Sequence, residues 1–230
     1  MREELLHLLF PHVCLLCKRL LLPGEEFCCS GCMEAFDPFS TVSEAEEELR
    51  STIAAHFGAR FSFERGWCRY LFHKKSALQQ VLHSMKYEGL FNLGTSFGHQ
   101  LGKWILSDGR FGHIDCLVPI PLHRLKKIER SYNQSEKIAE GLAQLLRKPV
   151  RSEFLVRQRF TVSQTGLSAV DREKNSAGAF LATRGVRGRH VLLIDDVVTT
   201  GATMAAAAEA LRAGGAISIS LAALALAAKE

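Results

Sequence analysis

The chain has 230 residues, of which 47% are hydrophobic and 23% charged, and its formal net charge is +5 at pH 7. This is enough apolar material for one main domain with a packed core and a small additional module. No apolar run reaches the roughly 18 to 20 residues of a membrane-spanning helix, and the first residues lack the cleavage pattern of a secretory signal, so we expect a cytoplasmic protein. The mild basic excess favours anionic ligands without by itself indicating nucleic acid.

Two pairs of cysteines near the N-terminus have the spacing of a zinc site. Cys14 and Cys17 form one C-x2-C pair, and Cys29 and Cys32 form the second after eleven intervening residues. Cytoplasmic cysteines are normally reduced, and two such pairs can close a tetrahedral shell of thiolates around Zn²⁺. We therefore predict a structural zinc site with these four ligands. Cys28 could replace Cys29 in a C-x3-C pair but is treated as a spare, and the competing interpretation is a set of buried or redox-active cysteines.

Helix and strand patterns alternate along the middle of the chain. The predicted helices span residues 43–56, 77–87, 93–107 and 134–147, and the predicted strands span 61–70, 115–121 and 153–156. We interpret the acidic helix at 43–56, with Ser43 as its cap, as a short surface helix with a solvated face.

A cluster of cations follows the strand at 115–121. Four of seven consecutive positions are basic, namely Arg124, Lys126, Lys127 and Arg130. Guanidinium and ammonium groups beside a strand end could neutralise a pyrophosphate. They could instead form an exposed basic patch.

Residues 191–204 read VLLIDDVVTTGATM, an apolar run followed by two acids and a turn of small and hydroxylated residues. The pattern predicts a buried strand that turns into an alanine-rich helix ending near residue 212. Asp195 and Asp196 can accept hydrogen bonds from sugar hydroxyls, while the turn and the helix N-terminus favour a phosphate. The turn consists of Thr199, Thr200, Gly201, Ala202 and Thr203. The motif thus suits a ribose 5-phosphate; the alternative is an ordinary strand and loop whose acids and threonines only start a helix.

A last strand is predicted at residues 216–226, which completes a βαβ alternation. Alternation of this kind implies a parallel sheet with ligands at the carboxyl ends of its strands. The acid pair and the basic segment both follow strands. We therefore expect them to face one ligand.

These motifs resemble those of a known family. The acid-tipped strand resembles the phosphoribosyl-diphosphate loop of type I phosphoribosyltransferases. The run PIPLHRLKKIERSYNQSEKIAEGLA is similar to the corresponding region of the ComF family, phosphoribosyltransferase-like proteins associated with competence for DNA uptake. The matching residues are Arg130, Tyr132, Asn133 and Gln134, with Ser131 in place of a glycine, and Lys86, Tyr87 and Gly89 match a further family element near the sugar-phosphate site.

The resemblance implies a fold and a division into domains. The expected fold is α/β, a doubly wound parallel sheet of the type I phosphoribosyltransferase kind with a small N-terminal zinc ribbon. The expected parts are a four-cysteine zinc-binding module at 1–36, an acidic helical linker at 37–60 and a phosphoribosyltransferase-like domain at 61–230. A segment resembling a mobile lid contains Thr161, Gln164, Leu167, Arg172 and Asn175.

The resemblance also implies a function. The chain would bind phosphoribosyl diphosphate with Mg²⁺ through Asp195, Asp196, the turn at 199–203, Lys86 and Tyr87. It would transfer the phosphoribosyl group to an acceptor and release pyrophosphate, which Arg124, Lys126 and Arg130 would stabilise. Candidate catalytic residues are Asp195, Asp196 and Arg172, and no general base is identified. No N-terminal cysteine nucleophile is present, so glutamine-driven amination is not expected.

The alternative function belongs to another class. The chain could be a non-catalytic adaptor that senses a nucleotide and binds single-stranded DNA or a helicase-like partner through its zinc module. Lys18, Arg19, Lys74 and Lys75 are available for such contacts.

Overall fold

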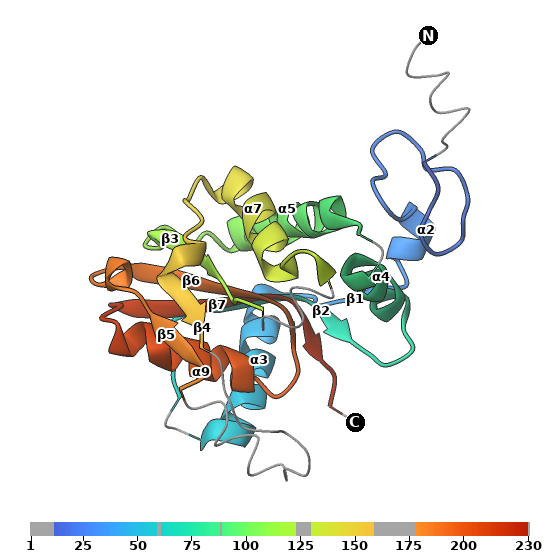
Figure 1. Cartoon of the computed structure of the whole chain (residues 1–230). Helices are drawn as coiled ribbons and strands as arrows, with labels where there is room; N and C mark the ends of the chain where they lie inside the picture. The colour runs from blue at the N-terminus through green and yellow to red at the C-terminus, as the bar shows by residue number, and fades with distance from the viewer. Residues whose placement is uncertain (1–11, 59–60, 88, 123–129, 159–177, 230) are drawn as a thin grey trace, which may run out of the picture.

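The computed structural model describes residues 12–58, 61–87, 89–122, 130–158 and 178–229. Its centre is a five-stranded sheet in the order β1-β2-β7-β6-β3 (Figure 1). The strands are β1 (Asp37–Pro38), β2 (Gly66–Phe72), β3 (Cys116–Pro119), β6 (His190–Val198) and β7 (Ser218–Ala227). Neighbouring strands from β2 to β3 pair in parallel, and only the short edge strand β1 is antiparallel.

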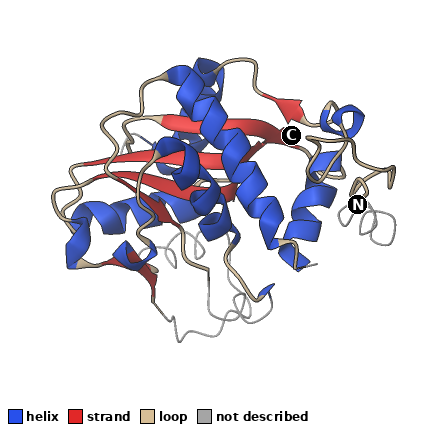
Figure 2. Cartoon of the chain, turned by 90° about the horizontal axis from the view of Figure 1, so that it is seen from above, coloured by secondary structure: helices blue, strands red, loops and turns tan. Residues whose placement is uncertain are grey.

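Helices cover both faces of this sheet, as Figures 1 and 2 show. The helices are α3 (Val42–Phe57), α4 (Ala77–Tyr87), α5 (Phe91–Asp108), α7 (Gln134–Leu146) and α9 (Ala202–Ala213). Successive residues of β7 alternate between two cores: Ala222 and Leu224 join the cluster of α4, α5 and α7, whereas Leu221 and Ala223 join that of α3 and α9. A strand covered on both faces is apolar along most of its length, which explains the run LAALALA at residues 221–227. The doubly wound α/β fold predicted from the sequence is confirmed.

The acidic helix is part of one of these layers. α3 begins after Thr41, whose side chain accepts a hydrogen bond from the backbone N–H of Glu44 at 3.1 Å, so the predicted cap at Ser43 was wrong. Leu49 and Ile53 of α3 are fully buried against the sheet and α9. Glu44 and Glu47 are exposed, as expected of a solvated face, but Glu46 is buried and paired with Arg50. The opposite face of the helix belongs to the core.

One predicted strand does not join the parallel sheet. β4 (Leu155–Arg157) pairs with β5 (Phe180–Ala182) in a separate antiparallel ribbon, so its placement in the βαβ alternation was wrong. Only Leu155 of its three residues is buried. A strand buried on one face suits a peripheral ribbon rather than the centre of a covered sheet.

The cysteine-containing segment packs on the same core. It includes the short helix α2 (Ser30–Met33), and Phe27 packs against Phe97 of α5 with ring centroids 4.8 Å apart and ring planes tilted by 56°. Phe36 meets Tyr70 of β2 edge-on at 5.5 Å.

The domain limits at 1–36, 37–60 and 61–230 remain predictions. Within the described residues, no helix has the length and hydrophobicity needed to cross a membrane.

α5 and α7 cross in direct backbone contact, and this crossing generates a prediction. A Cβ at Gly98 would lie 2.2 Å from the carbonyl oxygen of Ile138, and one at Gly141 would lie 2.2 Å from that of Thr95. Gly98→Ala should therefore force the helices apart and lower the free energy of unfolding by about 1–3 kcal/mol, measured by urea denaturation. Gly112→Ala, where the added Cβ meets nothing within 4 Å, is the control. Equal stabilities of the two variants would contradict this account.

Candidate functional site

The acid pair lies at the carboxyl end of β6, beside the end of β3. The two strands remain paired there, because the backbone N–H of Ile120 donates to the carbonyl of Ile194 at 2.9 Å. Asn133 caps α7 and also donates from Nδ2 to the carbonyl of Ile120 at 3.0 Å. One side chain thus ties the end of β3 to the start of α7, directly next to Asp195.

Asp195 is held by two hydrogen-bond donors. Its Oδ1 accepts from the Ser135 hydroxyl and from the backbone N–H of Asp196, each at 2.9 Å. Burial, and then the negative charge of Asp196, raise the pKa of the Asp195 carboxyl to about 7. Near neutral pH this group therefore exists in both protonation states and can donate or accept a hydrogen bond.

Asp196 is instead paired with a cation. The Lys86 ammonium group, at the end of α4, lies 2.9 Å from its Oδ2, and the backbone N–H of Val197 donates to its Oδ1 at 2.8 Å. The charge of Lys86 offsets that of Asp196. The two adjacent carboxylates therefore have different partners and are held by different helical elements.

The predicted turn encloses a small cavity of about 40 Å³ at the start of α9. Its lining runs from Asp195 through Val197 and Val198 and then along the turn to Met204. Gly201 has φ +80°, and a Cβ there would meet Ile53 of α3 at 2.6 Å, so both conformation and space favour glycine. Thr199 and Thr200 are exposed at the mouth. The turn thus presents hydroxyls and a helix N-terminus beside a carboxylate.

The segment before α7 brings a cation to the same place. Arg130 donates from Nη1 to Gln134 at 3.1 Å, and its Cζ lies 5.6 Å from the centroid of the Tyr87 ring. Its Nε is buried and has no hydrogen-bond partner among the described residues. The Tyr132 hydroxyl donates to the carbonyl of Met85, which fixes this segment against α4.

Ser131 occupies the position at which the family pattern carries glycine. Its backbone is left-handed, with φ +63°. This is the conformation for which glycine was expected, and a serine adopts it here at a steric cost.

The structure brings most of the sequence-predicted groups to one edge of the sheet. These are Asp195, Asp196, the turn at 199–203, Lys86, Tyr87 and Arg130. Arg124 and Lys126, together with the lid residues Thr161, Gln164, Leu167, Arg172 and Asn175, lie outside the described residues. Sequence reasoning missed Ser135, because a serine in the first turn of a helix is common and carries no signal of its contact with a residue sixty positions away.

The four predicted zinc ligands also come together. The sulfur atoms of Cys14, Cys17, Cys29 and Cys32 all lie within 4.8 Å of one another, and those of Cys17 and Cys29 are 3.7 Å apart. Tetrahedral Zn–S bonds of about 2.3 Å require sulfurs about 3.8 Å apart, so the cluster fits a structural zinc ion. Cys28, the spare cysteine, lies outside this cluster.

The pKa values of the thiols differ within this group of cysteines. Burial opposes ionisation of Cys14, but hydrogen bonds from the backbone N–H groups of Cys29, Cys17 and Leu16 outweigh it and lower the pKa of Cys14 to about 6. Burial raises the pKa of the Cys28 thiol to about 12. A side-chain hydrogen bond with Cys29, and then burial, raise the pKa of Cys32, a member of the cluster, to about 12 as well. The positions of the sulfur atoms, and not their pKa values, therefore separate Cys28 from the predicted ligands.

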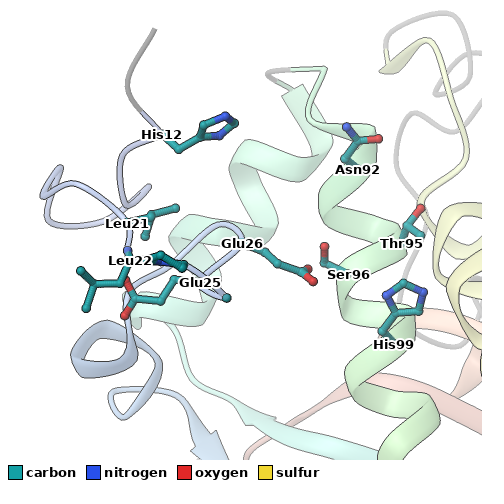
Figure 3. A pocket seen from close by; sticks show the side chains of 11 residues that line it. His12, Leu21, Leu22, Glu25, Glu26, Asn92, Thr95, Ser96 and His99 are labelled. Carbon is teal, nitrogen blue, oxygen red and sulfur yellow. The ribbon is translucent and has the colours of Figure 1, made fainter. Parts of the chain in front are cut away.

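A larger cavity of about 590 Å³ lies between part of the cysteine segment and α5 (Figure 3). Asn92, Thr95, Ser96 and His99 line it on α5, and His12, Leu21, Leu22, Glu25 and Glu26 are among the residues facing them. Glu25 accepts from Arg19 at 2.9 Å, and the Glu26 side chain extends toward Ser96 in Figure 3. Two carboxylates on one wall disfavour phosphate, so this cavity is chemically distinct from the turn after β6.

The sequence is similar to those of several known proteins. The phosphoribosyl transferase domain family matches residues 133–230. Competence protein F of Haemophilus influenzae is 27% identical over 207 residues, covering 86% of this chain and 90% of that protein. DNA utilization protein YhgH of Escherichia coli is 28% identical over 214 residues, covering 91% and 94%. Competence protein ComFC of Bacillus subtilis is 34% identical over 98 residues, covering 41% and 37%.

Cys14→Ser should abolish stoichiometric zinc binding and lower the melting temperature, because metal binding and folding are coupled at such sites. Zinc content is measured on the purified full-length chain by atomic emission. Cys28→Ser removes a neighbouring thiol outside the cluster and should retain the metal. Loss of zinc from Cys28→Ser, with retention in Cys14→Ser, would contradict the ligand assignment.

Asp195→Asn should change how stability depends on pH. The pKa of Asp195 is about 7 in the folded chain, against an ordinary value of 3.8. The folded state keeps a proton that the unfolded state releases, so the wild-type free energy of unfolding falls as the pH rises from about 4 to about 7. Asn has no proton to release. Between about pH 4 and pH 7, the free energy of unfolding of the variant should therefore fall less than that of the wild type, by on the order of 2–4 kcal/mol.

Urea denaturation at several pH values measures this difference. Glu34→Gln, which alters an exposed side chain, should follow the wild-type profile. Parallel profiles for wild type and Asp195→Asn would show that the carboxyl is not held in its protonated form.

Proposed function

The chain fits the ComF family, and from this premise we propose that it binds phosphoribosyl diphosphate with Mg²⁺ and transfers the phosphoribosyl group to an acceptor. One observation carries the proposal. A pair of carboxylates, a hydroxyl-rich turn at a helix N-terminus and the cation Arg130 converge on the same edge of a parallel sheet. Ligands of parallel α/β proteins bind at this edge, the carboxyl ends of the strands.

Each group suits one part of the ligand. Asp195 and Asp196 can accept hydrogen bonds from the 2′ and 3′ hydroxyls, and the turn at 199–203 can donate backbone N–H groups to the 5′-phosphate. Arg130 has a buried Nε without a partner among the described groups, which suits an anion such as the pyrophosphate. Arg124 and Lys126 would add to this charge.

The acid pair also suits magnesium. Mg²⁺ is commonly bound by one or two carboxylates together with substrate phosphates, and it retains several waters. Asp195 and Asp196 supply such carboxylates at the end of β6. Bound there with the ligand, the ion would offset negative charge on the pyrophosphate.

The chemistry is a substitution at C1 of the ribose. The bond from C1 to the pyrophosphate oxygen breaks, the acceptor forms a bond to C1, and pyrophosphate leaves with the bonding electrons. The chain would contribute orientation and charge stabilisation of an oxocarbenium-like state. Lys86 pairs with Asp196, so ligand binding would require this ammonium group to share or exchange its partner.

Nucleotide sensing without catalysis is the second candidate. It is favoured by the packing of the cysteine segment on α5 through Phe27 and Phe97, which joins this segment to the layer that contains Arg130. In this case the segment would contact single-stranded DNA or a helicase-like protein. Pyrophosphate release with a panel of bases and amines supports the enzyme. Salt-dependent binding of single-stranded DNA that survives loss of both aspartates supports the adaptor.

The double variant Asp195→Asn/Asp196→Asn should weaken phosphoribosyl diphosphate binding by about a hundredfold or more, because two charged acceptors are lost. Isothermal titration calorimetry with Mg²⁺ measures the affinity, and circular dichroism checks that the fold is intact. Asp37→Asn changes an exposed carboxylate on β1, which is separated from β6 by β2 and β7, and should leave the affinity unchanged. Unchanged affinity in the double variant would exclude the acid pair as the ribose site.

A further inference from the structure

Three exposed arginines lie at the end of the sheet opposite the acid pair. Residues 184–189 read RGVRGR and lead from β5 into β6. Arg184, Arg187 and Arg189, here called the arginine cluster, are all exposed. Figure 1 shows this segment, in orange, at the left end of the sheet, away from the C-terminus. Because the acid pair lies near the other end of β6, the two features are about 20 Å apart along the strand.

Neighbouring elements fix the backbone of this segment. It begins with the short 3₁₀ helix η3 (Arg184–Val186), whose last residue is buried. The backbone N–H of Gly188 donates to the carbonyl of Gly215, and that of Ile217 donates to the carbonyl of Arg189, each at 2.9 Å. The arginine cluster is therefore carried by a segment that is bonded to the start of β7.

The arginine cluster has no acidic partner among the residues that the structure describes, since none of its three guanidinium groups forms an ion pair there. Two arginines of neighbouring segments are compensated: Arg151 lies 3.9 Å from Glu153, and the charge of Glu209 acts on Arg212. Three like charges within six consecutive residues repel one another. An anionic partner would relieve this repulsion.

An apolar side chain lies beside the arginine cluster. Ile217, directly before β7, is 64% exposed, and its backbone is bonded to Arg189. Arginine is enriched at protein interfaces, and its guanidinium group can bind a carboxylate through two parallel hydrogen bonds. Three unpaired guanidinium groups next to an exposed isoleucine suit a protein segment that carries several carboxylates and an apolar side chain.

Single-stranded nucleic acid fits this surface less well. Proteins bind such strands with aromatic side chains, on which the bases stack, as well as with cations. Among the described residues, the exposed aromatic side chains are those of Tyr87 and Phe91. Both belong to the other end of the sheet, because Tyr87 follows Lys86, the partner of Asp196. The charge of the arginine cluster is thus accompanied by an aliphatic and not by an aromatic surface.

We propose that the arginine cluster and Ile217 form a docking surface for an acidic segment of a partner protein. Carboxylates of the segment pair with the three guanidinium groups, and an apolar side chain between them covers Ile217. The surface lies at the end of the sheet opposite the acid pair. The proposal is therefore independent of the function proposed above, and a partner can dock while the acid pair holds its ligand.

The test uses a fluorescein-labelled peptide of eight aspartates and glutamates with two leucines at its centre. Fluorescence anisotropy with the full chain should show binding that weakens between about 50 mM and about 300 mM NaCl, because salt screens exposed charges. A second peptide, with serines in place of the two leucines, should bind about threefold more weakly, since it cannot cover Ile217. Absence of binding at the lower salt concentration would overturn the proposal.

A matched pair of variants separates the arginine cluster from net charge. Arg184→Gln/Arg187→Gln/Arg189→Gln should bind the leucine peptide about tenfold more weakly than the wild type, the effect of losing three exposed ion pairs. The control variant removes the same charge from exposed positions of other segments and should keep the wild-type affinity: Lys18→Gln/Lys75→Gln/Lys103→Gln. Circular dichroism checks that both variants are folded. Equal losses of affinity in the two variants would assign binding to net charge alone and exclude this surface.

Ile217→Ser tests the apolar contact separately. This variant should bind the leucine peptide about threefold more weakly than the wild type does, and it should bind the serine peptide with unchanged affinity. An equal loss for both peptides would show that the isoleucine does not meet the leucines, and the apolar part of the docking surface would be excluded.

Two further measurements distinguish this proposal from its alternatives. If a labelled oligothymidine binds through the arginine cluster while the acidic peptide does not bind, the surface serves nucleic acid and the protein partner is excluded. The arginine variant should keep the wild-type affinity for phosphoribosyl diphosphate, and a loss would show that the cluster is not separate from the acid pair. If the wild-type chain binds the peptide but not phosphoribosyl diphosphate, the proposed function fails while the docking surface stands.

Discussion

The parallel pairing of β3 with β6 is the constraint on which the candidate site depends. It aligns the two strands so that both end at the same edge, where the backbone N–H of Ile120 still bonds Ile194. Asp195 and Asp196 lie near the end of β6, and the segment that leads to Arg130 follows β3. Asn133 then uses its two side-chain groups to cap α7 and to bond Ile120, which sets the position of α7 relative to the acids. A different strand order would separate charges that now lie together.

The two acids illustrate how the surrounding layers give identical side chains different properties. Lys86 compensates Asp196, whereas Asp195 is buried next to that charge and has only neutral donors. The pKa of Asp195 consequently lies near neutrality. A partly protonated carboxyl is less costly to bury than a second full charge, and it can still bond a hydroxyl in either state. The site thus contains one carboxylate that is paired with a cation and one that is held by neutral donors.

The cysteine segment depends on two kinds of interaction. It is too short to form a hydrophobic core of its own, and segments of this size usually require a metal or another external support. The four clustered sulfurs of the segment suit a metal ion. The contact of Phe27 with Phe97 supports the segment on the core of the main domain. This contact reaches α5, which itself crosses α7 at Gly98 and Gly141. The segment, α5 and α7 therefore form one continuous packed unit that reaches the edge with the acids.

The sequence by itself determined the α/β class, the extent of α4, the central strands and the grouping of the four cysteines, because these features rest on local periodicity and spacing. Only the tertiary structure decided which side chains hold the acids, since Ser135 and Lys86 are distant in sequence from Asp195 and Asp196. It likewise moved β4 into a separate ribbon and placed the apolar face of α3 in the core. Local pattern sets which elements form, but hydrogen-bond partners and burial depend on which elements meet, and no local signal encodes that choice.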